Sequence, residues 1–293
     1  VGPFLLLAVL MLGGAYWWLD PNPPKTVRLA TGPAQSAYAN FGQRYAKALA
    51  KDGISVQLVA TQGSADNLRL LREGAVDLGF VRGGTADPAE LEDANLESLG
   101  SLFLEPVWLF YREAVAPADT TPPQTLDSLT QLQGLRVNVG TTGSGIPNLM
   151  GKLLESNRIA PTALTLSQLE QTPATVALLA GELDAIVFAS APESSLVQML
   201  LQTPGIKLMD FAQNEAYSRR FSFVSPVVLP RGVVDLAANI PARNVRLIAP
   251  TTTLLTRDGT HPALLQLFAL AGNTIHGGPG WVKHAREFPN IKN

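Results

Sequence analysis

The chain has 293 residues, of which 46% are hydrophobic and 16% charged, and its mean hydropathy is +0.14. This length predicts at least one substantial core and permits two modest lobes. The net charge of −2 provides no broad basic surface for phosphates, so nucleic acid is not expected as a partner. Cysteine is absent and only three histidines occur, which excludes thiolate chemistry and argues against a metal or histidine-based catalytic site. We therefore expect no metal and no cofactor.

The N-terminal residues 1–19 contain no charged side chain and end in a Tyr-Trp-Trp cluster. Their length is close to the ~17-residue minimum for crossing a bilayer, and aromatic residues favour the headgroup region. We predict a membrane anchor or uncleaved signal over residues 1–19, and a cleaved signal peptide is the alternative. Residues 20–25 contain three prolines and are predicted to form a stiff linker.

The folded body begins with alternating strand-like and helix-like segments. Hydrophobic periodicity predicts strands at 26–30, 54–60 and 76–81, with helices at 34–51 and 63–72 between them. The last strand is apolar throughout, as in a strand buried within a parallel sheet. This order predicts a β-α-β-α-β lobe.

A similar order follows the polar, proline-containing stretch 116–124. A strand at 136–139, a helix over 143–157 and a strand at 164–166 are predicted there. The segments 70–77 and 178–184 also resemble each other, because each joins two leucines, a glycine suited to a helix C-cap and an aspartate before an apolar strand. This likeness predicts two related lobes that face a cleft. The alternative is that helix and strand packing alone imposes the same pattern on any two such units.

Two apolar stretches, 101–112 and 221–230, are candidates for the connections between the lobes. Each contains one proline, which favours an edge or a crossover over a central strand. We predict an α/β bilobed fold with a first lobe over 26–112, a second lobe over 113–225 and a return to the first lobe over 226–293. The two strands of the hinge are expected near residues 111–117 and 222–226.

Three turns combine glycines and small hydroxyl residues where a strand ends and a helix begins: 31–36, 61–64 and 140–145. Free backbone N–H groups at such turns bind anions such as carboxylates, and ligands of open α/β sheets lie at this edge. Ordinary helix capping by the serines is the alternative. Arg82, after the third strand, could pair with a ligand carboxylate or be a solvated arginine. Tyr38 and Phe188 could line the cleft or belong to the core.

Known catalytic patterns are missing from the same turns. Residues 140–145 have the pattern G-x-x-G-x-G, which differs from the dinucleotide-binding G-x-G-x-x-G, and no lysine of a P-loop follows. The G-x-S-x-G pattern around a nucleophilic serine is also missing. We therefore expect that the protein is not an enzyme.

Five segments together resemble one known family: ATGPAQSAYANFGQRYAKAL, TQGSADNLRLLREGAVDLGFVRGG, SLFLEPVWLFYR, LRVNVGTTGSG and LPRGVVDLAANIPARNVRLIAPT. The chain is similar to the TAXI-type solute-binding proteins of TRAP transporters, especially membrane-anchored members. The resemblance covers nearly all of residues 26–290 and implies a periplasmic-binding-protein fold of type II. It further implies a location at the periplasmic or extracytoplasmic face, a membrane permease as partner, and capture of a small carboxylate-bearing solute (an amino acid, dicarboxylate or 2-oxo acid).

The resemblance also implies which positions face the ligand. They are Thr31, Gly32, Ser36, Tyr38, Gly63, Ser64, Asn67, Thr141, Thr142, Gly143, Ser144 and Phe188, to which the analysis of the turns adds Arg82. The sequence departs from many relatives at Arg82, where they carry a glutamine-like residue, and at 33–35, where they have a glycine-rich turn. A membrane-tethered sensor or scaffold that uses the same fold without a transport partner is the alternative function.

Overall fold

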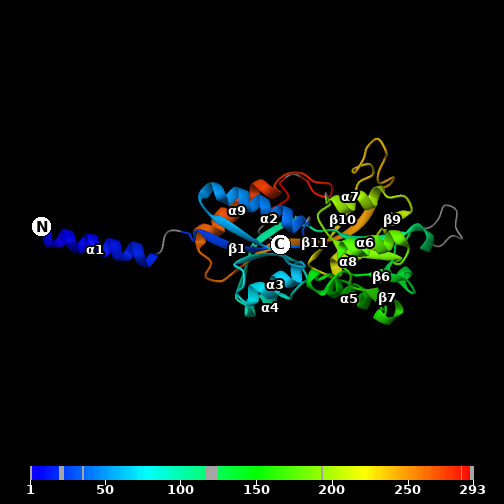
Figure 1. Cartoon of the computed structure of the whole chain (residues 1–293), viewed down its shortest axis with the longest axis horizontal. Helices are drawn as coiled ribbons and strands as arrows, with labels where there is room; N and C mark the ends of the chain where they lie inside the picture. The colour runs from blue at the N-terminus through cyan, green and yellow to red at the C-terminus, as the bar shows by residue number, and fades with distance from the viewer. Residues whose placement is uncertain are drawn as a thin grey trace.

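The protein has two α/β lobes side by side, and a separate helix extends away from the first lobe (Figure 1). The structure is a computed structural model, and it describes residues 2–19, 23–34, 36–116, 125–192, 194–284 and 286–290. The expected linker at 20–25 and the turn at 31–36 lie only partly within the described residues. Both lobes contain mixed sheets, in which parallel and antiparallel strands lie side by side.

The first lobe is built on the strands β11, β3, β1 and β2 of a sheet in the order β10-β11-β3-β1-β2, with β4 also pairing with β11; β10 (Val224–Leu229) at the edge of this sheet packs with the second lobe. Its parallel strands are β1 (Thr26–Ala30), β2 (Ser55–Val59) and β3 (Leu78–Arg82). The helices of this lobe are α2 (Ala37–Leu49), which continues as η1 (Ala50–Asp52), α3 (Ser64–Arg72), α4 (Pro88–Asp93) and α9 (Pro262–His276). The antiparallel strands are β4 (Leu96–Leu104) and part of β11 (Val245–Arg257). The predicted β-α-β-α-β order is therefore present.

The second lobe repeats this design with a sheet in the order β7-β6-β8-β5-β9. Its strands are β5 (Val107–Arg112), β6 (Arg136–Asn138), β7 (Thr165–Ser167), β8 (Ala185–Ala189) and β9 (Ile206–Leu208). Its helices are α5 (Ile146–Ser156), α6 (Gln171–Ala180), α7 (Ser195–Gln202) and α8 (Asn214–Arg220), with short 3-10 turns η2 (Glu113–Val115), η3 (Leu129–Leu132), η4 (Thr142–Ser144) and η5 (Pro161–Ala163). The parallel strands β6, β7 and β8 again lie beside an antiparallel strand, β5.

The chain passes between the lobes at places that differ from the expected boundaries. The first crossing is at Glu105 and Pro106, because β4 belongs to the first sheet and β5 to the second. The predicted boundary at 112 therefore falls at the end of β5. Five of the six residues of β5 are fully buried, and a strand this apolar requires cover on both faces, which the middle of the second sheet provides.

The second crossing lies within β11 and not near 222–226. The first half of β11 pairs with β10 (Val224–Leu229), and Leu247 and Ile248 join the hydrophobic core of the second lobe. Its second half, from Thr251, pairs with β3 and β4 of the first lobe. The segment 226–250 therefore packs with the second lobe, whereas α9 lies on the first lobe and packs on α2.

The two lobes share one hydrogen-bonded arrangement of an arginine, an aspartate and a glycine. In the first lobe, the Arg28 backbone N–H donates to Asp77 Oδ2 at 2.7 Å, and the Arg28 guanidinium donates to the carbonyl of Gly74 at 3.2 Å. In the second, the Arg136 N–H donates to Asp184 Oδ2 at 2.8 Å and its guanidinium to the carbonyl of Gly181 at 2.9 Å. Both glycines have positive φ, 70° and 81°, which favours glycine. The repeat seen in the sequence is therefore a structural repeat.

Helix α1 (Gly2–Leu19) is the element that stands away from the body in Figure 1. Its side chains at residues 2–15 are exposed. Within the described residues, no helix combines the length and apolar character needed for crossing a membrane. The predicted membrane anchor is thus not confirmed.

Replacing Asp184 with asparagine tests the hydrogen-bonded arrangement that the two lobes share. Hydrogen bonds from the Arg136 side chain hold the pKa of Asp184 below its ordinary value of 3.8. The carboxylate therefore stabilises the fold above that value, and this contribution is lost as the pH falls through the lower pKa of the folded state. We expect D184N to lower the free energy of unfolding by about 1–3 kcal/mol at neutral pH, with a smaller difference from the parent near pH 3, in urea unfolding followed by circular dichroism.

The matched control is D258N, because Asp258 is exposed and its side chain makes no hydrogen bond or ion pair with the residues that the structure describes. This account would be contradicted if D258N lowered the free energy of unfolding as much as D184N does. It would also be contradicted if the effect of D184N on that free energy were as large near pH 3 as at neutral pH.

Candidate functional site

A cavity of about 610 Å³ lies between the two lobes. The first lobe contributes the start of α2, the turn between β2 and α3, the end of β3 and the crossing at Glu105, and the second lobe contributes the turns that follow β6, β7 and β8. These are the carboxyl ends of parallel strands, where open α/β sheets hold their ligands. The cavity is thus the candidate ligand site of this fold.

Eight of the thirteen residues expected at the ligand line this cavity: Ser36, Tyr38, Gly63, Ser64, Arg82, Thr141, Ser144 and Phe188. The remaining five are not part of its lining: Thr31, Gly32, Asn67, Thr142 and Gly143. The fold therefore brings segments far apart in the sequence to one cavity, and the ligand contact of each residue remains a prediction.

The residues outside the lining support the turns beside it. Asn67 is fully buried, and its amide nitrogen donates to the carbonyls of Thr31 at 2.6 Å and Phe80 at 2.8 Å. The Thr142 hydroxyl donates to Gln168 Oε1 at 3.1 Å. Asn67 thus fixes the end of β1 against the end of β3. Both donor hydrogen bonds of its amide nitrogen are made within the protein.

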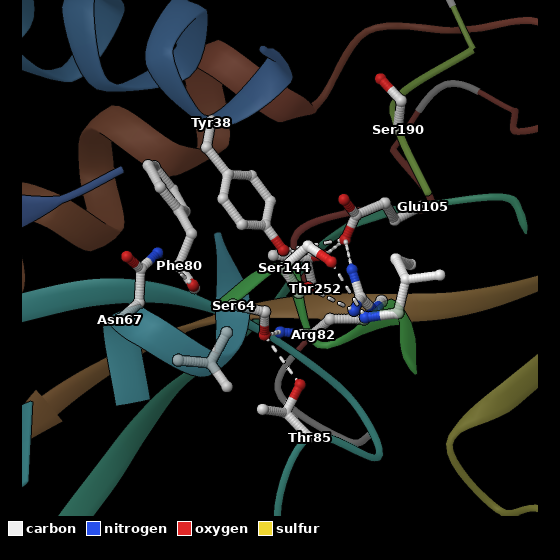
Figure 2. Close-up of polar contacts among 12 residues, drawn as sticks. Tyr38, Ser64, Asn67, Phe80, Arg82, Thr85, Glu105, Ser144, Ser190 and Thr252 are labelled. Carbon is white, nitrogen blue, oxygen red and sulfur yellow. Dashed lines mark hydrogen bonds and ion pairs between the residues drawn. The ribbon is translucent and has the colours of Figure 1, made fainter. Parts of the chain in front are cut away.

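The three predicted serines have local partners. Ser36 is the N-cap of α2, and its hydroxyl accepts from the N–H of Ala39 at 3.2 Å. Ser64 is buried beside the end of β3, where its hydroxyl accepts from the N–H of Arg82 at 2.7 Å (Figure 2). The Ser144 hydroxyl donates to the carbonyl of Thr141 at 2.6 Å. These bonds fix the three turns, so the walls of the cavity are ordered by the protein itself.

A buried polar network, drawn in Figure 2, includes three residues that line the cavity: Tyr38, Arg82 and Glu105. Oε2 of Glu105 accepts hydrogen bonds from the hydroxyls of Tyr38 and Thr252, both at 2.8 Å, and it lies 3.7 Å from Nη1 of Arg82. Burial raises the pKa of Tyr38 well above its ordinary value, and the charge of Glu105 raises that pKa further. Tyr38 is therefore a stable donor. Arg82 and Glu105 are each only 4% exposed, so the arginine is a buried partner of a protein carboxylate.

Glu105 was not among the residues expected from the sequence, although the sequence contains a signal for it. It is the only charged residue in the apolar run 101–111. A charged side chain in a segment that must be buried requires a partner of opposite charge or several hydrogen bonds. Its partners are distant in the sequence, so the run alone does not identify Arg82, Tyr38 or Thr252.

Several contacts join the lobes across the cavity. Nη2 of Arg82 donates to the carbonyl of Ser144 at 2.9 Å. Gln62 donates to Glu170 and accepts from the hydroxyl of Thr141, both at 3.3 Å. On the adjacent face, Nζ of Lys152 donates to the carbonyl of Gly84 at 3.1 Å. The structure therefore shows the lobes in contact around the cavity, which is the closed arrangement.

The charges that line the cavity are unequal. Three carboxylates, of Asp66, Glu105 and Glu170, accompany the single guanidinium of Arg82. Elsewhere, no group of three His, Cys, Asp or Glu side chains within the described residues is placed to hold a metal ion. The lining offers charged groups, hydroxyls and amides, which can bind a small polar molecule by ion pairs and hydrogen bonds.

The two lobes and the cavity between them define a periplasmic-binding-protein-like fold. Residues 29–262 match the NMT1-like family, and the chain belongs to that family. The finer likeness to TAXI-type proteins is not confirmed by this match.

Solved structures with the same fold include proteins that bind different ligands. The alkanesulfonate-binding protein SsuA from Xanthomonas axonopodis pv. citri is 15% identical, with a TM-score of 0.55 and coverage of 87% of this chain and 74% of that chain. An arginine-specific periplasmic binding protein from Salmonella typhimurium is 13% identical (TM-score 0.50, 87% and 95% covered), and the GluR0 ligand-binding core in complex with L-glutamate is 9% identical (TM-score 0.54, 87% and 94% covered). At these identities the likeness establishes the fold.

Enlarging Gly143 should prevent the closed arrangement. A Cβ atom at this position would lie 2.6 Å from Cβ of Gln62 and 2.7 Å from Oδ2 of Asp66, both in the opposite lobe. We expect G143V to hold the lobes apart. Because the chain contains no cysteine, spin labels on K47C in α2 and E155C in α5 report the distance between the lobes by double electron-electron resonance.

The expected result is a longer and broader distance distribution for G143V than for the labelled parent. The control is G151A, because a Cβ atom at Gly151 of α5 meets no atom within 4 Å. A G143V distribution that superimposes on that of G151A would show that the contact does not limit closure.

Proposed function

We propose that this protein is a solute-binding protein that captures a small molecule by closing its lobes. The observation that carries the proposal is the cavity of about 610 Å³ whose walls come from both lobes. A solute in such a cavity would contact both lobes only in the closed arrangement, so that binding and closure would stabilise each other. Membership of the NMT1-like family agrees with this function.

We further propose that the protein acts at the extracytoplasmic face and delivers its solute to a membrane permease, as the TAXI-type resemblance implies. A carboxylate on the solute would be met by the turns at Ser36, Gly63 and Ser144, which line the cavity next to the starts of α2, α3 and α5. The exposed, apolar residues 4–12 of α1 support attachment to the membrane through residues 1–19.

A thermal-shift screen of the full chain tests capture. The library contains amino acids, dicarboxylates, 2-oxo acids and sulfonates. A solute at 100 times its dissociation constant is expected to stabilise the folded state by about 2.7 kcal/mol, which raises the unfolding midpoint by several degrees. In the spin-labelled protein, the same solute should narrow the distribution of distances between the lobes.

G143V is compared with the parent protein in the same screen. Because this variant should resist closure of the lobes, it should need a higher solute concentration for the same rise in the unfolding midpoint. If no solute in a broad library raises the midpoint or changes the distance between the lobes, the capture proposal fails and the sensor or scaffold alternative is favoured.

A further inference from the structure

The second carboxylate oxygen of Glu105 is not used by the protein. All contacts of the Glu105 side chain described above are to Oε2, whereas Oε1 has no hydrogen-bond partner among the described residues. In Figure 2, this oxygen points away from Tyr38, Thr252 and Arg82. Among the described residues, the side-chain polar atoms that are both fully buried and without a hydrogen-bond partner are Tyr45 Oη and His276 Nε2. Oε1 of Glu105 is not one of them, so this unpaired oxygen is accessible, and Glu105 lines the cavity.

The position of this oxygen is fixed before any ligand arrives. The hydroxyls of Tyr38 and Thr252 and the guanidinium of Arg82 hold Oε2 from α2, β11 and β3. Glu105 itself lies at the crossing between the lobes, and its backbone N–H donates to the carbonyl of Pro250 at 2.8 Å. A carboxylate held in this way loses little freedom on binding, which favours affinity and discrimination.

The charge of the lining indicates what Oε1 would accept. Arg82 offsets Glu105, and Asp66 is paired with Arg69 at 3.7 Å outside the lining, so the carboxylate of Glu170 leaves the lining with an excess of negative charge. A solute with only carboxylate groups would bring further negative charge to this surface. A carboxylate oxygen is an acceptor only, so its complement is a donor, and a cationic donor forms the stronger bond.

We propose that Oε1 of Glu105 binds a primary ammonium group of the solute, and that the solute is therefore an amino acid or another small amine. This inference rests on the proposed function, since it assigns one end of the captured molecule. Glu105 acts as a specificity-determining residue, which selects an ammonium-bearing solute over the same molecule without its amine. The alternative is that Glu105 serves only to neutralise Arg82 in the folded protein.

Matched pairs of ligands separate these two roles. Binding to the full chain is measured by isothermal titration calorimetry for L-alanine and propionate, L-leucine and 4-methylpentanoate, L-glutamate and glutarate, and L-arginine and 5-guanidinopentanoate. We expect at least one amino acid to bind the parent protein, with its partner binding about tenfold or more weakly, as the loss of a charge-assisted hydrogen bond implies.

The variant E105Q is expected to reduce this preference by about tenfold or more, because the amide carries no charge for the ammonium group. It also leaves Arg82 without its carboxylate partner, so binding of the des-amino acid should weaken less or become tighter. A general loss of stability would weaken both ligands alike. E97Q is the matched control, since Glu97 of β4 is exposed, lies outside the cavity and carries the same charge.

Circular dichroism and thermal unfolding establish that each variant folds. Where E105Q does not fold, E105D replaces it, because it keeps the negative charge near Arg82 and withdraws the carboxylate from the ligand by one methylene. The proposal is overturned if the parent binds des-amino acids as tightly as amino acids, if E105Q keeps the parent's preference, or if no amine binds. In each of these cases, a thermal shift with a dicarboxylate or a sulfonate would leave solute capture standing.

Discussion

The buried carboxylate of Glu105 is the interaction on which the arrangement of the two lobes depends. Removing a carboxylate from water costs several kcal/mol unless charges and hydrogen bonds replace the solvent. Here the replacement comes from Tyr38 on α2, Arg82 at the end of β3 and Thr252 on β11. Because Glu105 and Thr252 lie on the two segments that cross between the lobes, one network fastens both crossings to the first lobe.

The same network reaches into the second lobe. Arg82 is held by Glu105 on one side and donates to the carbonyl of Ser144 on the other. The arginine therefore couples this network to a wall of the cavity in the second lobe. Since the contacts of Arg82 lie within the protein, its charge is partly compensated before any solute enters. This changes the role expected of Arg82, from a free partner for a carboxylate to a link between lobes and a support for Glu105.

The internal repeat explains why the cavity has walls of similar construction. Each lobe places its parallel strands with their carboxyl ends toward the other lobe, and each fixes its third strand through an aspartate that accepts from the N–H of an arginine, Arg28 or Arg136. The crossing strands break this symmetry. Strand β5 enters the second sheet directly after the first lobe, whereas β11 serves both lobes along its length. The hinge is thus one short crossing and one long strand.

The sequence by itself determined the first parallel strands and helices of both lobes, their repetition and the turns that meet at the cavity. Hydrophobic periodicity and glycine placement are local properties, so the strands β1, β2, β3 and β6 and the serines Ser36, Ser64 and Ser144 could be located without knowing their partners. Tertiary structure alone decided where the chain crosses between lobes and which charges meet. An apolar strand such as β5 fits either sheet until its neighbours are known, and Arg82, Glu105 and Thr252 are brought together only by pairing between strands distant in the chain. The free oxygen of Glu105 is a property of that pairing, and no local pattern contains it.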